Sequence, residues 1–304
     1  MTRFKAPVNY NKPSGRFTGR FPNMPMGVQL LSDWVVHKFN FFRVADLPVT
    51  TVGWTITATG AGAATLTDDV FPPGVNLTNA AADNDSLELQ FTATDGTGEF
   101  LNPPTDCPIY FEIMLSLNDA NGDDSSVEQA DVFVGLCTTD TTVIDGATDF
   151  IGFLKRDLTD DSTGRINFVC GDAGGAAGAL VDQFVSATGW VALNPDAIAT
   201  SGTDAAAALH RAQKVLGAGE LIKLAFLLEP TGDGANGRAW AWVNDALTSN
   251  SPMDVTGFVP NEALCVTVAV QNGEAVAKVL TVYNIVAAQS IYDDSNVLLG
   301  VPAA

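Results

Sequence analysis

The sequence has 304 residues, enough for one large β domain or two small ones. Hydrophobic residues make up 46% of it and charged residues only 16%, and the remaining polar positions favour Thr, Asn, Ser and Gly, a mixture typical of strands and tight turns. The net charge of −20 argues against general binding to nucleic acid or to anionic membranes, because like charges repel.

The basic residues are concentrated near the N-terminus. Residues 1–43 contain seven of the 15 Lys and Arg residues but only one of the 35 Asp and Glu residues, which gives them a net charge of +6 and leaves −26 for the remainder. Residues 44–154 contain no Lys or Arg. A basic arm on an acidic body indicates docking onto an acidic surface, which a neighbouring copy of the chain could also provide.

Residues 1–27 are predicted to be irregular, and they contain the tandem Gly15-Arg16-Phe17 and Gly19-Arg20-Phe21. Arg and Phe side chains on an arm that cannot fold alone are good anchors for the pockets of a partner. The alternatives are a disordered tail or an arm packed on its own body. The residues that we assign to the binding arm are Arg3, Lys5, Lys12, Arg16, Phe17, Arg20 and Phe21.

No export signal or membrane anchor is recognisable. Pro7, Pro13, Pro22 and Pro25 occupy the place where a signal peptide would have its apolar core. No apolar run approaches the roughly 20 residues of a transmembrane helix. We therefore expect a soluble chain that is not exported through a membrane.

From about residue 28 onward the sequence predicts strands. Residues 52–59 and 86–93 alternate apolar and polar side chains, as half-buried strands do. Residues 265–271 and 274–283 flank Asn272-Gly273, a pair that favours the type I′ turn of a tight hairpin. The other predicted strands are 34–42, 109–115, 130–136, 150–154, 165–170, 221–228 and 238–243, the last followed by a turn at Asn244-Asp245.

One helix is predicted, over residues 205–216, with Thr203 or Asp204 as its N-cap and Gly217 as its end. Ten or so strands with at most one helix indicate an all-β fold, an antiparallel jelly roll or β-sandwich. We expect a basic arm and entry strand over 1–43, one sandwich domain over 44–290, and a C-terminal tail over 291–304.

The sequence predicts no enzyme. None of the motifs of hydrolases, zinc proteases or P-loop proteins occurs, and the two histidines, His37 and His210, lie in ordinary surroundings. Glycoside hydrolysis needs two carboxylates that flank the scissile bond. Glu88 and Glu112 lie inside predicted strands, but neither has a second acid two residues away.

A metal site and a disulfide framework are also not expected. An oxygen-rich loop containing Asp119, Asn121 and Asp123 could hold Ca²⁺, but it lacks the glycine and the later glutamate of an EF-hand and is more typical of a solvated turn, so we predict no cofactor. The four cysteines are far apart, without zinc spacing. We expect buried free thiols and assembly in a reducing cytoplasm.

Sugar binding is the main rival hypothesis. Trp190, Trp240 and Trp242 could stack on sugar rings, although tryptophans on alternating strand positions are more often part of the core. In residues 238–243 the two tryptophans share one face of the predicted strand. Nucleic acid could bind only through the arm, and the −26 body opposes it.

Several stretches of the sequence resemble structural proteins of tailed bacteriophages. They are residues 55–66, 77–90, 109–112, 131–136 and 149–155, which combine turns of small residues with strand edges. The resemblance extends over roughly residues 50–290 and is to capsid decoration (cement) or head-fibre proteins with a concanavalin-like jelly roll. The chain lacks the paired Asp and Asn metal ligands of legume lectins and the long helix of the common tailed-phage major capsid fold.

This resemblance implies a virion protein on the outer capsid surface, assembled in the host cytoplasm. Its partner would be the major capsid protein, whose subunits the arm would bridge and stabilise. We expect a homo-oligomer, specifically a trimer, with an outward face that binds host glycans weakly. The alternative is a glycan-binding adhesin or a head or tail fibre domain.

Overall fold

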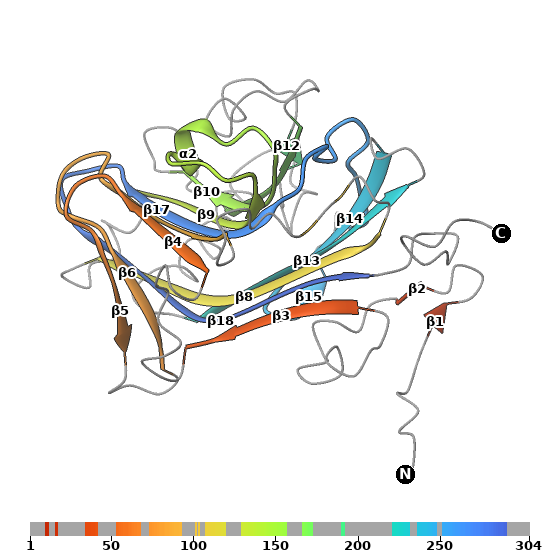
Figure 1. The fold of residues 1–304 in the computed structure, drawn as a ribbon, viewed down its shortest axis with the longest axis horizontal. Helices are drawn as coiled ribbons and strands as arrows, with labels where there is room; N and C mark the ends of the chain where they lie inside the picture. The colour runs from red at the N-terminus through yellow and green to blue at the C-terminus, as the bar shows by residue number, and fades with distance from the viewer. Residues whose placement is uncertain are drawn as a thin grey trace, which may run out of the picture.

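The structure is a computed structural model that describes residues 34–41, 53–67, 73–92, 107–119, 129–156, 166–172, 221–231, 236–247 and 251–290, with the short pieces 10–11, 16–17, 101, 103 and 190–191. Within these residues the chain forms two large antiparallel sheets stacked face to face, and a separate two-stranded sheet (Figure 1). The predicted all-β, antiparallel jelly-roll sandwich is confirmed.

The first large sheet has seven strands. In spatial order they are β12 (Trp190–Val191), β11 (Ile166–Gly171), β10 (Phe150–Lys155), β9 (Ala130–Cys137), β17 (Cys265–Asn272), β7 (Ser86–Phe91) and β4 (Trp54–Ala58). A short helix, α2 (Val143–Gly146), lies over the outer face of this sheet (Figure 1). The connection between β9 and β10 therefore covers β9 and its other neighbour, β17.

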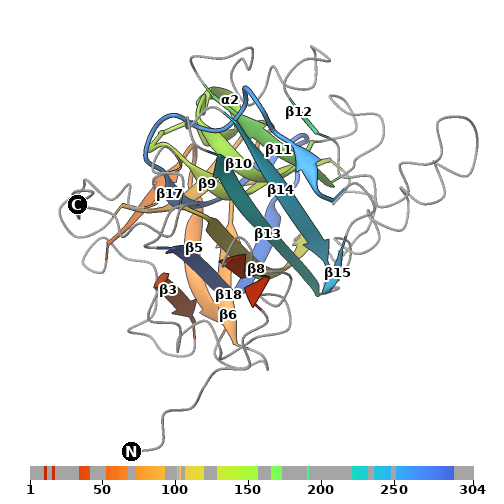
Figure 2. The same ribbon diagram turned by 90° about the vertical axis from the view of Figure 1, so that its right-hand side faces the viewer.

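The second large sheet has nine strands. The main path is β15 (Ala246–Leu247), β14 (Asn236–Val243), β13 (Ile222–Thr231), β8 (Ile109–Asp119), β18 (Lys278–Ser290), β6 (Gly74–Thr78) and β5 (Ala63–Thr67), while β16 (Met253–Asp254) pairs with β14 and β3 (Trp34–Asn40) with β18. Figure 2 shows β13 and β14 running side by side across this sheet. A register shift between Val282 and Asn284 divides β18 into a part that pairs with β6 and a part that pairs with β3.

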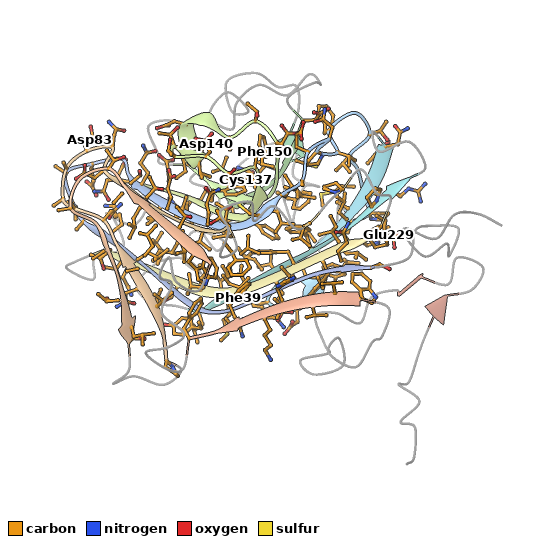
Figure 3. All side chains as sticks on the ribbon, in the orientation of Figure 1. Phe39, Asp83, Cys137, Asp140, Phe150 and Glu229 are labelled. Atoms are coloured by element: carbon orange, nitrogen blue, oxygen red, sulfur yellow. The ribbon has the colours of Figure 1, made fainter. Side chains whose placement is uncertain are left out.

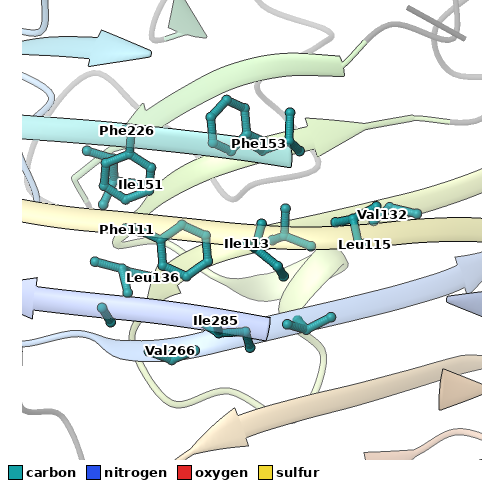
Figure 4. Close-up of a cluster of buried hydrophobic side chains, with 14 of the residues drawn as sticks. Phe111, Ile113, Leu115, Val132, Leu136, Ile151, Phe153, Phe226, Val266 and Ile285 are labelled. Carbon is teal, nitrogen blue, oxygen red and sulfur yellow. The ribbon is translucent and has the colours of Figure 1, made fainter. Parts of the chain in front are cut away.

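The core lies between the two sheets and is built from the inward-facing positions of the strands. Phe111 and Phe226 stack at a ring distance of 5.3 Å on neighbouring strands of one sheet, and Phe153 and Phe168 meet at 5.7 Å on neighbouring strands of the other. Phe168 reaches across to Phe226 at 5.6 Å. Figure 4 shows part of this cluster, in which aliphatic side chains fill the space around the rings.

Each predicted strand overlaps a strand of the structure where it is described, although the one predicted from residue 274 begins only at Lys278, and one predicted hairpin is wrong. The segments on either side of Asn272-Gly273 belong to different sheets, so β17 and β18 are joined by a crossover and not by a tight turn. The type I′ conformation occurs instead at Asn244 and Asp245, where φ is +50° and +66° and Val243 pairs with Ala246. The predicted helix at 205–216 lies outside the described residues.

The described part of the chain contains no helix that is long and apolar enough to cross a membrane. The basic arm is described only at β1 (Tyr10–Asn11) and β2 (Arg16–Phe17), which pair with each other and with neither large sheet. The tail at 291–304 lies outside the described residues.

Two leucine substitutions test the position of the core. Leu136 is fully buried, whereas Leu247 is 51% exposed. Leu136→Ala should lower the free energy of unfolding by about 2–5 kcal/mol, because it removes buried surface and leaves a cavity. Leu247→Ala removes the same atoms and should cost less than about 1 kcal/mol, as for most surface changes. If urea denaturation showed the same loss of unfolding free energy for both variants, this assignment of inward and outward faces would be wrong.

Candidate functional site

Side chains on the outer face of the seven-stranded sheet form a buried polar network. Glu88 and Gln90 project from β7, and Thr267 and Gln271 from the neighbouring β17. All four are less than 9% exposed, because residues 138–149, which contain α2, lie across them. Figure 3 shows Cys137, Asp140 and Phe150 together on the side of the sheet where α2 lies.

Hydrogen bonds from these strands hold the covering segment in place. Gln90 accepts a bond from the Asp140 N–H at 3.0 Å and donates to the carbonyl oxygen of Thr138 at 3.2 Å. Gln271 donates to Oδ2 of Asp145 at 3.1 Å. Residues 138–149 are therefore attached to the sheet at both ends of α2.

Glu88 makes the central contact of this network. Its Oε1 accepts a hydrogen bond from the Val143 N–H at 2.8 Å, while its buried Oε2 has no hydrogen-bond partner among the described residues. Burial raises the pKa of Glu88 to about 7; the Val143 bond opposes the rise, and Asp140 and Asp145 add to it. Near neutral pH the carboxyl group is thus divided between its neutral and charged forms.

The other half of this face is apolar. Phe133, Phe150 and Leu154 of the sheet pack against Val143 and Ile144 of α2. A Cβ atom at position 171 would lie 2.4 Å from Cζ of Phe150, so the ring can lie across this strand only because residue 171 is glycine. The covering segment is therefore held on the sheet by apolar packing as well as by hydrogen bonds.

The outer face of the nine-stranded sheet carries an aromatic cluster. Tyr110, Leu227 and Trp242 are buried there, with Trp240 and Trp34 packed against them half-buried. Trp242 belongs to this cluster and Trp240 packs against it, which confirms the prediction that the two tryptophans share one face. Trp242 is only 6% exposed, so of these two tryptophans Trp240 offers the larger surface to a ligand.

A charged network borders this aromatic cluster. The Tyr110 hydroxyl donates to Oε2 of Glu112 at 2.6 Å. Nζ of Lys223 lies 3.2 Å from the same oxygen and 2.8 Å from Oδ1 of Asp245. Burial lowers the pKa of Lys223, but the two carboxylates outweigh burial and raise it, so the lysine stays charged. Polar groups of both signs therefore lie beside the exposed side of the cluster.

The remaining predicted site residues are only partly described. Arg16 and Phe17 form β2, opposite Asn11 and Tyr10. Trp190 belongs to β12 and pairs with Val169. Asp119 ends β8. Arg3, Lys5, Lys12, Arg20, Phe21, Asn121 and Asp123 lie outside the described residues.

The two acidic residues that the sequence singled out do not come together in the described part of the chain. No group of three or more His, Cys, Asp or Glu residues could hold a metal ion within those ranges. Glu88 and Glu112, which the sequence singled out, lie in different sheets and on opposite outer faces. They therefore do not flank a common cleft.

Comparisons with known proteins give a likeness of fold only. No protein-family model and no curated protein matches the chain. Among solved structures, a protein of unknown function from Shewanella oneidensis matches at a TM-score of 0.45 and 9% identity over 89% of this chain and 90% of its own. Peanut lectin matches at a TM-score of 0.46 and 10% identity, over 85% of this chain and 98% of its own. The alginate lyase vAL-1 from Chlorella virus matches at a TM-score of 0.40 and 8% identity, over 77% of this chain and 92% of its own. At these values the matches do not bear on function.

Glu88 makes stability depend on pH. A carboxyl group whose pKa rises from 4.5 unfolded to about 7 folded contributes stability that is present at low pH and is lost as the pH rises through 7. Glu88→Gln keeps an oxygen for the Val143 N–H but cannot ionise. The variant should therefore gain stability relative to the wild type between pH 5 and pH 8, by on the order of 2 kcal/mol.

Urea denaturation at the two pH values measures this gain. Glu262→Gln is the matched control, because Glu262 is exposed. A constant difference between Glu88→Gln and the wild type at both pH values would show that Glu88 does not titrate in the folded protein near pH 7.

Proposed function

We propose that this chain is a structural attachment protein, a binding protein and not an enzyme, which fastens to the outer surface of a phage capsid through its basic N-terminal arm. The observation that carries the proposal is the division of charge. Residues 1–43 carry a net charge of +6 and the remainder −26, so an acidic surface attracts the arm and repels the body. The resemblance of residues 50–290 to phage decoration proteins supports a virion location and the major capsid protein as partner.

The short hairpin of the arm supports a docking role. Among the described strands, β1 and β2 pair only with each other, and an isolated two-stranded hairpin is at best marginally stable in water. Contact with a partner would stabilise it. Arg16 would pair with carboxylates of the capsid surface and Phe17 would enter an apolar pocket, which are the contacts that dominate protein interfaces.

The sandwich would serve as the rigid body that carries the arms. In a trimer, three arms would reach neighbouring capsid subunits and bridge them. Each arm could then bind weakly, because the second and third contacts form at a high effective concentration. Such bridging would stabilise the shell mechanically without a cofactor, after assembly in the host cytoplasm.

Truncation and charge reversal test the arm. Removal of residues 1–27 should abolish co-sedimentation with capsids of the source phage that have been stripped of accessory proteins. The double variant Arg16→Glu, Arg20→Glu should weaken binding at least about tenfold at low salt, where charges are least screened. Arg238→Glu is the matched control, because Arg238 is exposed on β14. Unchanged binding of the truncated protein would contradict the proposal.

Glycan binding is the second candidate, and the aromatic outer face favours it. Trp240 is half-buried on that face in the same cluster as Tyr110, whose hydroxyl is bonded to Glu112, and an indole ring with polar groups nearby can stack on a sugar. Trp240→Ala should then lose at least about tenfold in retention on glycan-coated beads. Leu247→Ala, which removes an exposed apolar side chain from the neighbouring strand β15, should not. Equal retention of the two variants would exclude Trp240 from the site.

A further inference from the structure

Two of the four cysteines lie directly opposite each other in the seven-stranded sheet. Cys137 is the last residue of β9 and Cys265 the first residue of β17, and the register pairs them. Both are fully buried. They lie on the outer face of the sheet, beside the Glu88 and Gln90 network and beneath the segment that contains α2.

The spacing of this pair suits a disulfide. Residues directly opposite in antiparallel strands have Cα atoms roughly 4.5–5.5 Å apart, within the roughly 4.4–6.8 Å that a disulfide spans. Sγ of Cys137 lies 3.2 Å from Oγ1 of Thr267 and that of Cys265 lies 3.5 Å from the same atom. The two sulfur atoms therefore share Thr267 as a neighbour on the same face of the sheet.

The other two cysteines do not share this arrangement. Cys170 packs in the core between the sheets, where its thiol donates to the Phe258 carbonyl oxygen at 3.1 Å. In the register, Cys170 lies opposite Ile151 and not opposite a cysteine. Cys107 is buried just before β8, in the other sheet. Of the paired strand positions that the structure describes, 137 and 265 are the one cysteine–cysteine pair.

We propose that Cys137 and Cys265 form a disulfide across β9 and β17 when the protein meets oxidising surroundings. A small-molecule disulfide such as glutathione disulfide would be the oxidant. One protein thiolate attacks it and releases one small thiol, and the second protein thiolate then displaces the other. The protein loses two protons and two electrons, and the oxidant takes them up to become two thiols.

The surroundings of the pair make this oxidation slow. Burial, together with the Cys265 contact, raises the pKa of Cys137 well above its usual range, so little of the reactive thiolate is present. Residues 138–149 must open, or the sheet must be incompletely folded, before an oxidant can reach the sulfur atoms. The pair therefore stays reduced through brief exposure and becomes oxidised on prolonged exposure.

The bond would lock the middle of the sheet. β9 and β17 are neighbours at its centre, and Cys265 follows Cys137 by 128 positions, so the bond closes a long loop of the unfolded chain. Closure of a long loop stabilises the folded state by restricting the unfolded one. Formation of the bond needs only an oxidant and no capsid or glycan, so it can be tested apart from the proposed function.

The test is oxidation of the full chain with glutathione disulfide in a urea concentration just below the unfolding transition. Free thiols are then blocked with N-ethylmaleimide in denaturant. We expect two blocked thiols instead of four, a cross-linked peptide pair containing Cys137 and Cys265, and a higher Tm that dithiothreitol reverses. Cys137→Ser and Cys265→Ser should each abolish the cross-link, whereas Cys107→Ser and Cys170→Ser should retain it.

Four blocked thiols in the oxidised wild type would overturn the proposal. So would a cross-link that joins any other pair or two separate chains. Peptide mapping of the wild type decides the question even if a serine variant fails to fold.

Discussion

Glu88 and Gln90 project from β7, the strand next to the edge strand β4 of the seven-stranded sheet, and hold residues 138–149 against its outer face. A buried carboxyl group is costly unless it is neutral or fully hydrogen-bonded. Glu88 bonds the Val143 N–H with one oxygen only, and burial moves its pKa to about 7, so the neutral form limits the cost. The apolar cluster around Phe133, which includes Cys137, lies under this covering segment, and the burial of these side chains depends on it.

Local periodicity predicted the strands but not what covers them. Residues 86–93 alternate, which places Leu87 and Leu89 in the core, as the structure confirms. The same pattern predicts exposed Glu88 and Gln90, yet both are buried. The cause is a contact with residues about 50 positions further along the chain, which no local pattern contains. What the sequence did not predict was thus the burial of side chains whose surroundings come from distant segments.

The incorrect hairpin has a similar origin. Asn272-Gly273 has the local preference for a tight turn, but the side-chain amide of Asn272 donates to the carbonyl oxygens of Ala80 and Ala82 and is fully buried. These contacts tie the end of β17 to the connection between β6 and β7, and the chain then crosses to the other sheet. At Asn244-Asp245 the side-chain oxygen of Asn244 accepts a hydrogen bond from the N–H of Lys223 on the adjacent strand. This contact does not compete with the tight turn, so the local preference decides the conformation.

The distribution of cations connects the fold to the proposed arm. Within the described sandwich, Arg156 pairs with Asp131, Lys278 with Glu274, and Lys223 with two carboxylates, while the Lys155 ammonium donates to a backbone carbonyl oxygen. These four cations already have partners within the fold, so they offer little attraction to a second acidic body. Two such bodies repel each other through their excess of carboxylates. Attraction to an acidic surface, whether a capsid or another copy, would therefore come chiefly from residues 1–43, where the net charge has the opposite sign.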